Sequence, residues 1–223
     1  MLSWIPDWAL DGLLSALEWL HVHVGDYGVA IILLTVVLRI LMIPLTVKQT
    51  RSMHELQRIQ PKIKEIQKKY KDDKQKQNEE LMKFYQENSI NPFGGCLPLL
   101  IQMPVFLALF GVLSRAEQLA GEPFWIILPD LRATPSAVLS EQGIVAALPY
   151  LVFVVLFGLS AWLPNRMLSK DRQQNRMGLF MSLMLLYFGW ISPAGVLLYW
   201  VTSSIWQMGQ QYVTLKMLEK EEA

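Results

Sequence analysis

Long hydrophobic runs alternate with polar segments along the chain, and the lengths of these runs indicate helices that cross a lipid bilayer. One crossing requires roughly 17–25 mostly apolar residues. Three runs meet this length, at 28–47, 97–114 and 144–163. A fourth run, from 177 to about 215, is too long for one crossing and contains a helix-stopping Ser-Pro-Ala-Gly sequence at 192–195. It therefore predicts two spans, at 177–191 and 194–215, and the whole pattern predicts an all-α membrane protein with five transmembrane helices.

The segment 48–92 has a different pattern, rich in Lys, Gln and Glu. Its apolar residues recur at intervals of three and four, which is typical of a helix with one narrow apolar face. These residues are Leu56, Ile59, Ile63, Ile66 and Tyr70, and a second stripe follows at Leu81, Met82, Phe84 and Tyr85. With a polar turn at 71–74 between the stripes, we expect an antiparallel helical hairpin. Because proline removes a backbone donor, we also expect a kink or a restart at Pro61.

The remaining segments are connections and termini. Residues 1–27 predict an amphipathic helix whose acidic residues Asp7, Asp11 and Glu18 share one face. This helix either lies on the outer leaflet as an interfacial helix or simply leads into the first span. The other segments are a loop at 115–143, a loop at 164–176 and a short tail at 216–223.

Composition agrees with a bilayer environment. Of 223 residues, 52% are hydrophobic and only 17% are charged, whereas about 25% of the residues in a soluble domain are charged. The mean hydropathy is +0.28.

The charges nearly cancel, to a net +1, but they are distributed unevenly. Residues 48–92 hold 11 Lys and Arg and residues 164–176 hold four, whereas residues 1–27 hold four acidic residues and no Lys or Arg. The positive-inside rule places both basic segments and the C-terminus in the cytoplasm, so the expected orientation is N-out, C-in. Since nothing before Arg39 is basic, no cleavable signal or transit peptide is predicted, and a bacterial inner (plasma) membrane is the expected location.

Arg39 lies inside the first predicted span, near the middle of the bilayer at 1.5 Å per residue. A cation at that depth costs between about 2.5 and 17 kcal/mol, so we expect it to have a function or to be hydrated locally. The five predicted spans contain no Asp or Glu, and the candidate partners are neutral: Thr35, Gln102, Ser203, Ser204 and Gln207. We expect a hydrated, positively charged cavity. The alternatives are an arginine that snorkels to the surface and a hydrogen bond that only packs helices.

The sequence contains no catalytic or metal-binding pattern. It has no Ser/His/Asp set, phosphate loop or zinc-ligand spacing, and His21 and His23 lack further ligands nearby. Cys96, the only cysteine, is expected to pack as a small side chain. We therefore expect no enzyme, no cofactor, no metal and no direct binding of nucleic acid.

Four stretches together resemble the YidC/Oxa/Alb family of membrane protein insertases, and the resemblance covers residues 28–215. The most specific stretch is 91–106 (NPFGGCLPLLIQMPVF). The other three are 38–46 (LRILMIPLT), 60–63 (QPKI) and 193–200 (PAGVLLYW).

The resemblance implies a five-helix core around a hydrophilic groove that contains Arg39, is open to cytoplasm and lipid, and is closed to the outside. It further implies that Thr35, Tyr199 and Trp200 line the substrate path, although many relatives carry Tyr where this chain has Trp200. At helical spacing, Trp200, Ser203 and Gln207 can share one face of the last span. The chain is similar to short bacterial members without a large extracytoplasmic domain, and its acidic end lacks the basic ribosome-binding tail of some relatives.

Our hypothesis is a membrane protein insertase and chaperone whose partners are nascent membrane proteins and the lipid bilayer. The apolar segment of a substrate would engage the third and fifth spans while its acidic end enters the Arg39 cavity. Burial in lipid, at about 0.8 kcal/mol per CH₂, would drive release without ATP. Residues 48–92 would dock a ribosome or targeting factor, rest on anionic lipid, or only space two spans, and a Sec-type channel is a further candidate partner. The alternative function is a transporter of a small anion or solute that uses Arg39, although no internal repeat is evident.

Overall fold

The computed structural model describes residues 6–88, 97–168 and 172–222. This part of the chain is built from helices, with an isolated bridge between Phe124 and Leu128 and no strand, so the all-α prediction is confirmed. Residues 91–96 of the most specific family-like stretch lie outside the described residues, as do 1–5 and 169–171. The chain forms two compact units, residues 1–41 with 104–208 and residues 42–103 with 209–223.

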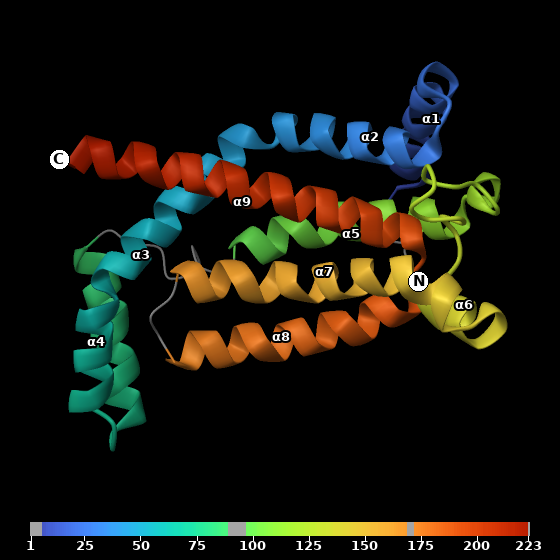
Figure 1. Ribbon diagram of the computed structural model, residues 1–223. Coiled ribbons are helices and arrows are strands. Elements are labelled where there is room, and N and C mark those ends of the chain that lie inside the picture. The colour runs from blue at the N-terminus through green and yellow to red at the C-terminus, as the bar shows by residue number, and fades with distance from the viewer. Residues whose placement is uncertain (1–5, 89–96, 169–171, 223) are drawn as a thin grey trace. The chain divides into compact units, whose positions relative to one another are not determined.

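Figure 1 shows the helices in chain order. The first unit contains α1 (Asp7–Val24), α2 (Tyr27–Leu41), the short 3₁₀ helix η2 (Glu117–Leu119), α6 (Pro135–Gln142), α7 (Ile144–Leu168) and α8 (Arg172–Ile191). The second contains α3 (Ile43–Lys69) and α4 (Lys74–Glu87). Two long helices contribute residues to both units, α5 (Leu97–Arg115) and α9 (Ala194–Glu222).

The first hydrophobic run is divided between two helices. α2 ends at Leu41 and α3 begins at Ile43, with Pro44 in its first turn. A single helix through this point would need a hydrogen bond from the nitrogen of Pro44 to the carbonyl of Ile40, and proline has no N–H to give. The proline instead occupies the start of a new helix, where no such bond is required.

The apolar residues of the described part of the chain are divided among several helices. No single described helix has both the length and the hydropathy of a full membrane span. α2 and α3 meet this test only when they are taken together across their break. Two shorter apolar stretches lie at Gln102–Leu113 of α5 and Ile144–Ser160 of α7.

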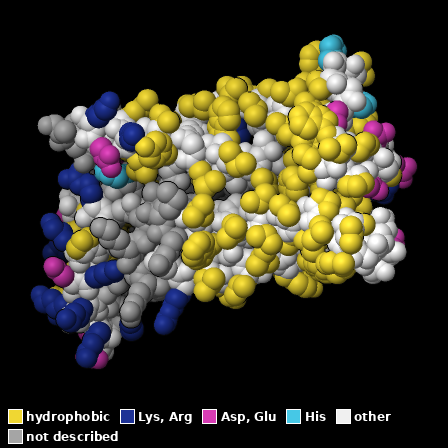
Figure 2. Space-filling view, viewed as in Figure 1, with side chains coloured by type: hydrophobic (Ala, Val, Ile, Leu, Met, Phe, Trp, Pro, Cys, Tyr) yellow, Lys and Arg dark blue, Asp and Glu magenta, His cyan; other side chains and the backbone are white. Residues whose placement is uncertain are grey.

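The hairpin in the second unit is formed by α3 and α4. Asp73 ends the turn between them and caps α4, because its carboxylate accepts a hydrogen bond from the backbone N–H of Lys76 at 3.0 Å. The amide of Gln77 donates to the carbonyl of Gln67 at 2.7 Å and joins the two helices. Pro61 lies inside α3 without ending it, so the helix does not restart there. Lys and Arg side chains gather over α3 and α4 (Figure 2).

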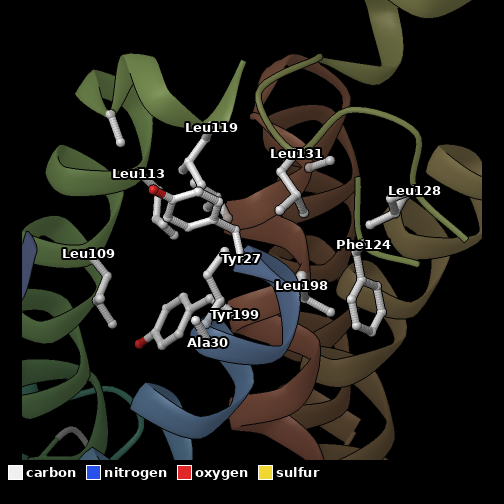
Figure 3. Packing of buried hydrophobic residues seen from close by; sticks show 14 of the residues in the cluster. Tyr27, Ala30, Leu109, Leu113, Leu119, Phe124, Leu128, Leu131, Leu198 and Tyr199 are labelled. Carbon is white, nitrogen blue, oxygen red and sulfur yellow. The ribbon is translucent and has the colours of Figure 1, made fainter. Parts of the chain in front are cut away.

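One large cluster of buried apolar residues, with two smaller clusters, forms the core of the first unit in the described residues. It includes Tyr27 and Ala30 of α2, Leu109 of α5 and Tyr199 of α9. Figure 3 shows these side chains packed together with residues of the connection between α5 and α6, including Leu119, Phe124, Leu128 and Leu131. The connection after α5 is therefore part of the core.

α7 and α8 lie side by side (Figure 1) and are packed closely. Gly158 allows this approach, since a Cβ there would lie 2.5 Å from Leu186. The hydroxyl of Ser182 donates to the carbonyl of Gly158 at 2.8 Å. Large apolar side chains of both helices are exposed (Figure 2), among them Val145, Leu148, Val152, Phe180, Leu183 and Tyr187. An exposed apolar surface of this extent is typical of a membrane-facing or partner-facing protein surface.

Candidate functional site: the Arg39 pair of helices

Arg39 occupies the last turn of α2 and is 6% exposed. Its Nε donates to the hydroxyl oxygen of Ser203 at 2.9 Å, and one terminal nitrogen donates to the same oxygen. The terminal nitrogen also donates to the amide oxygen of Gln207 at 3.3 Å. A charged donor is thus oriented by a hydroxyl and an amide, neither of which carries a charge.

The partners of Arg39 lie on one face of α9. Ser203 and Gln207 are four residues apart, and Tyr199 precedes Ser203 by the same interval, so the three side chains line one stripe of the helix. Tyr199 and Ser203 are each 2% exposed, whereas Gln207 is exposed. The polar stripe therefore runs from the buried core at Tyr199 to an accessible end at Gln207.

Thr35 lies one helical turn before Arg39 on α2 and is 2% exposed. Its hydroxyl donates to the carbonyl of Ile31 at 2.6 Å, within its own helix. Because a hydroxyl has two acceptor lone pairs, this bond leaves the oxygen of Thr35 able to accept a hydrogen bond. Thr35 thus adds an acceptor to the face of α2 that carries the arginine.

Trp200 contacts residues of α5 and α7. Its indole N–H donates to the hydroxyl of Ser160 on α7 at 2.9 Å. Its ring meets those of Phe106 and Phe157 edge-on, with centroids 5.1 and 5.0 Å away. Trp200 therefore joins α9 to α7.

The last two candidate residues, Gln102 and Ser204, lie on α5 and α9. Gln102 is half-buried on α5, in the second compact unit. Ser204, next to Ser203, is also half-buried.

The start of α9 is fixed by the connection between α5 and α6, a feature that sequence reasoning missed. The backbone N–H of Gly195 donates to the carbonyl of Leu131 at 2.7 Å, and that of Ala194 donates to Ala133 at 3.0 Å. Tyr150 of α7 accepts from the N–H of Asp130 at 2.9 Å and donates to its carbonyl at 3.1 Å. The bonds of Ala194 and Gly195 satisfy two N–H groups that have no partner within the helix at its start, and they fix where α9 begins.

The described residues contain no group of three or more His, Cys, Asp and Glu side chains that could hold a metal ion. The Arg39 site itself consists of a buried cation with a hydroxyl and an amide as neighbours. It can attract an anionic group and exchange hydrogen bonds with it.

Comparison with known proteins places this architecture in a family. The family described as "60Kd inner membrane protein" matches residues 19–221. A membrane protein insertase YidC from Caldanaerobacter subterraneus subsp. tengcongensis is 39% identical over 204 residues, which cover 90% of each chain. A YidC from Cellvibrio japonicus is 35% identical over 222 residues, 97% of this chain and 37% of the relative, so this chain spans little more than a third of that longer protein.

A solved structure agrees with the sequence matches. A crystal structure of an active YidC insertase with its first transmembrane domain resolved has a TM-score of 0.72 and 31% sequence identity to this chain. The similarity covers 92% of this chain and 46% of that one. With a family match over most of its length, similar sequences and a similar fold, this chain belongs to the YidC/Oxa/Alb family, the 60Kd inner membrane proteins.

Proposed function

We propose that this protein inserts membrane proteins into the bacterial inner membrane and assists their folding, and that the Arg39 site receives the polar end of the substrate. The observation that carries the proposal is the buried guanidinium of Arg39, held by Ser203 and Gln207 on a polar stripe that becomes accessible at one end. Membership of a family whose relatives are named insertases supports the same conclusion.

The magnitudes favour recognition of an acidic group. An Asp carried to the middle of a membrane costs about 2.5–3.5 kcal/mol. A carboxylate about 4 Å from a guanidinium gains about 4 kcal/mol at an effective dielectric constant of 20. The attraction to Arg39 is therefore large enough to offset the cost of moving one acidic side chain to the middle of the membrane. The hydrophobic segment that follows then gains about 0.8 kcal/mol for each CH₂ group that enters lipid, so the cycle needs neither ATP nor a cofactor.

We place the chain in the membrane with five spans, the N-terminus outside and the C-terminus in the cytoplasm. The exposed apolar side chains of α7 and α8 support this placement, because lipid covers such a surface at no cost. The break between α2 and α3 shortens the first apolar helix to 15 residues, and a short apolar segment thins the bilayer around it. Local thinning reduces the distance that a polar terminus has to cross.

The hairpin of α3 and α4 is the proposed docking arm for a ribosome or a targeting factor. Its polar, basic surface stands on helices joined by a capped turn, which suits a rigid arm in the cytoplasm. A Sec-type channel is a further proposed partner.

Reconstitution into liposomes tests the function. Purified protein is incorporated into sealed vesicles, and a single-span substrate with a short acidic N-terminus is synthesised in their presence. We expect protease protection of the translocated N-terminus in vesicles that contain the protein and not in empty vesicles. Saturable flux of a small anion without insertion of the substrate would show that the protein is a transporter instead.

A further inference from the structure

The connection between α5 and α6 carries an exposed apolar tip, residues 125–127 (Trp-Ile-Ile), here named the finger. Ile126 is 99% exposed and Trp125 is 63% exposed, whereas Phe124 and Leu128 on either side are buried in the core. The chain thus leaves the core, presents three large apolar residues, and returns to the core. Exposure of this much apolar area to water is unfavourable. The finger is therefore a candidate for contact with an apolar environment.

The finger is a built feature of the fold. Phe124 and Leu128 form a bridge, with the N–H of Phe124 donating to Leu128 at 2.8 Å and the N–H of Leu128 donating back at 3.2 Å. Trp125 has φ 46°, a left-handed conformation that a bulky residue rarely adopts. The surrounding contacts therefore hold Trp125 in a strained backbone conformation and keep the tip projecting from the core.

The base of the finger is attached to the first turn of α2. The N–H of Trp125 donates to one carboxylate oxygen of Asp26 at 3.2 Å, and the other oxygen of Asp26 accepts from the N–H of Val29 at 2.9 Å, at the start of α2. The ring of Phe124 lies directly against Gly28, where a Cβ would come within 2.3 Å of it. Since α2 begins the first proposed span, these contacts place the finger at the depth where the chain enters the membrane.

We infer that the finger inserts into the outer leaflet of the bilayer and anchors the extracytoplasmic end of the protein at the boundary between headgroups and acyl chains. Trp is favoured at this boundary because its ring is apolar and its N–H is polar, and the two Ile side chains supply the apolar contact. Glu122 and Asp130 flank the finger in the sequence, so its surroundings favour a zwitterionic surface over an anionic one. The inference rests on the proposed placement of α2 in the membrane.

Depth measurement with a fluorescent label tests the inference. Single cysteines are introduced in a Cys96→Ser background as Ile126→Cys, Val152→Cys and Glu141→Cys, and each is labelled with an environment-sensitive dye. All three native side chains are exposed, so the substitutions leave packing intact. The labelled protein is reconstituted in phosphatidylcholine vesicles. Quenching is measured with aqueous iodide and with lipids that carry a nitroxide at a shallow or a deep acyl position.

We expect the label at Ile126 to be quenched most by the shallow nitroxide, at a depth of about 5–10 Å, and to be shielded from iodide. The label at Val152 of α7, near the middle of the proposed span at 144–163, serves as the deep reference, and the label at Glu141 on α6 serves as the aqueous reference. Iodide quenching at Ile126 equal to that at Glu141 would overturn the inference, and so would shielding from both quenchers, because a protein partner would then cover the finger. Iodide access at Val152 would instead contradict the proposed membrane placement itself.

Discussion

Removal of the Ser203 hydroxyl tests whether the Arg39 site joins α2 to α9 as strongly as its geometry indicates. Ser203→Ala deletes the acceptor of two guanidinium nitrogens and leaves Arg39 buried with the amide of Gln207. A hydrogen bond to a charged group contributes about 1.5–3 kcal/mol in soluble proteins. In a membrane protein, measured couplings across helices average about 0.6 kcal/mol and reach about 1.7, because unfolded segments in lipid also find partners. For a charged donor with two bonds to one acceptor, we expect a coupling of about 1–2 kcal/mol.

The assay is a double-mutant cycle with Arg39→Met and Ser203→Ala, read as the free energy of reversible unfolding in mixed micelles. The cycle removes effects that each substitution has on its own. The matched control replaces Ser203→Ala with Thr202→Ala, because among the described residues the hydroxyl of Thr202 donates only to the carbonyl of Leu198, in its own helix. We expect no coupling between Arg39 and Thr202. A coupling below about 0.3 kcal/mol between Arg39 and Ser203 would refute the reasoning, because independent sites already deviate from additivity by about that amount.

Two further substitutions test how the connection after α5 is held against α2 and α7. Gly28→Ala places a methyl group against the ring of Phe124 and should destabilise the protein by about 1–3 kcal/mol. The control Gly12→Ala should not destabilise it, because a Cβ at Gly12 would have no neighbour within 4 Å. A Tm for Gly28→Ala equal to that of the control would contradict the packing described. Tyr150→Phe removes both hydrogen bonds to the backbone of Asp130. Amide hydrogen exchange should become faster in the connection after α5, while exchange in α7 stays slow. Unchanged exchange in the connection would show that Tyr150 does not hold the connection in place.

The helical class and the choice of Arg39 as a candidate site residue were accessible from the sequence, because both depend on local composition. Apolar length identifies helices in lipid, and one cation inside such a run is conspicuous whatever its neighbours are. The break at Met42 is less visible, since both sides of it are apolar. Pro44 is the signal that could have located it, because a proline in the first turn is typical of a helix that begins there.

The contacts of Trp200 could not be predicted from spacing alone. Spacing shows which residues can share one face of a helix, but not which neighbouring helix each side chain meets. The bond from Trp200 to Ser160 and its ring contact with Phe157 depend on where α7 lies. The bond from Gly195 to Leu131 likewise joins segments that are distant in the sequence, so periodicity gives no sign of it.

The most direct test of the central claim compares two substrates that differ only in the charge of a short N-terminus, one acidic and one neutral, with protein carrying Arg39, Arg39→Lys or Arg39→Ala. If the cation of Arg39 receives the polar end of the substrate, Arg39→Ala should slow insertion of the acidic substrate by at least about tenfold, which corresponds to about 1.4 kcal/mol of the barrier. Insertion of the neutral substrate should change little, and Arg39→Lys should retain most of the acidic rate. Equal rates for both substrates in the Arg39→Ala protein and the unmodified protein would contradict the account.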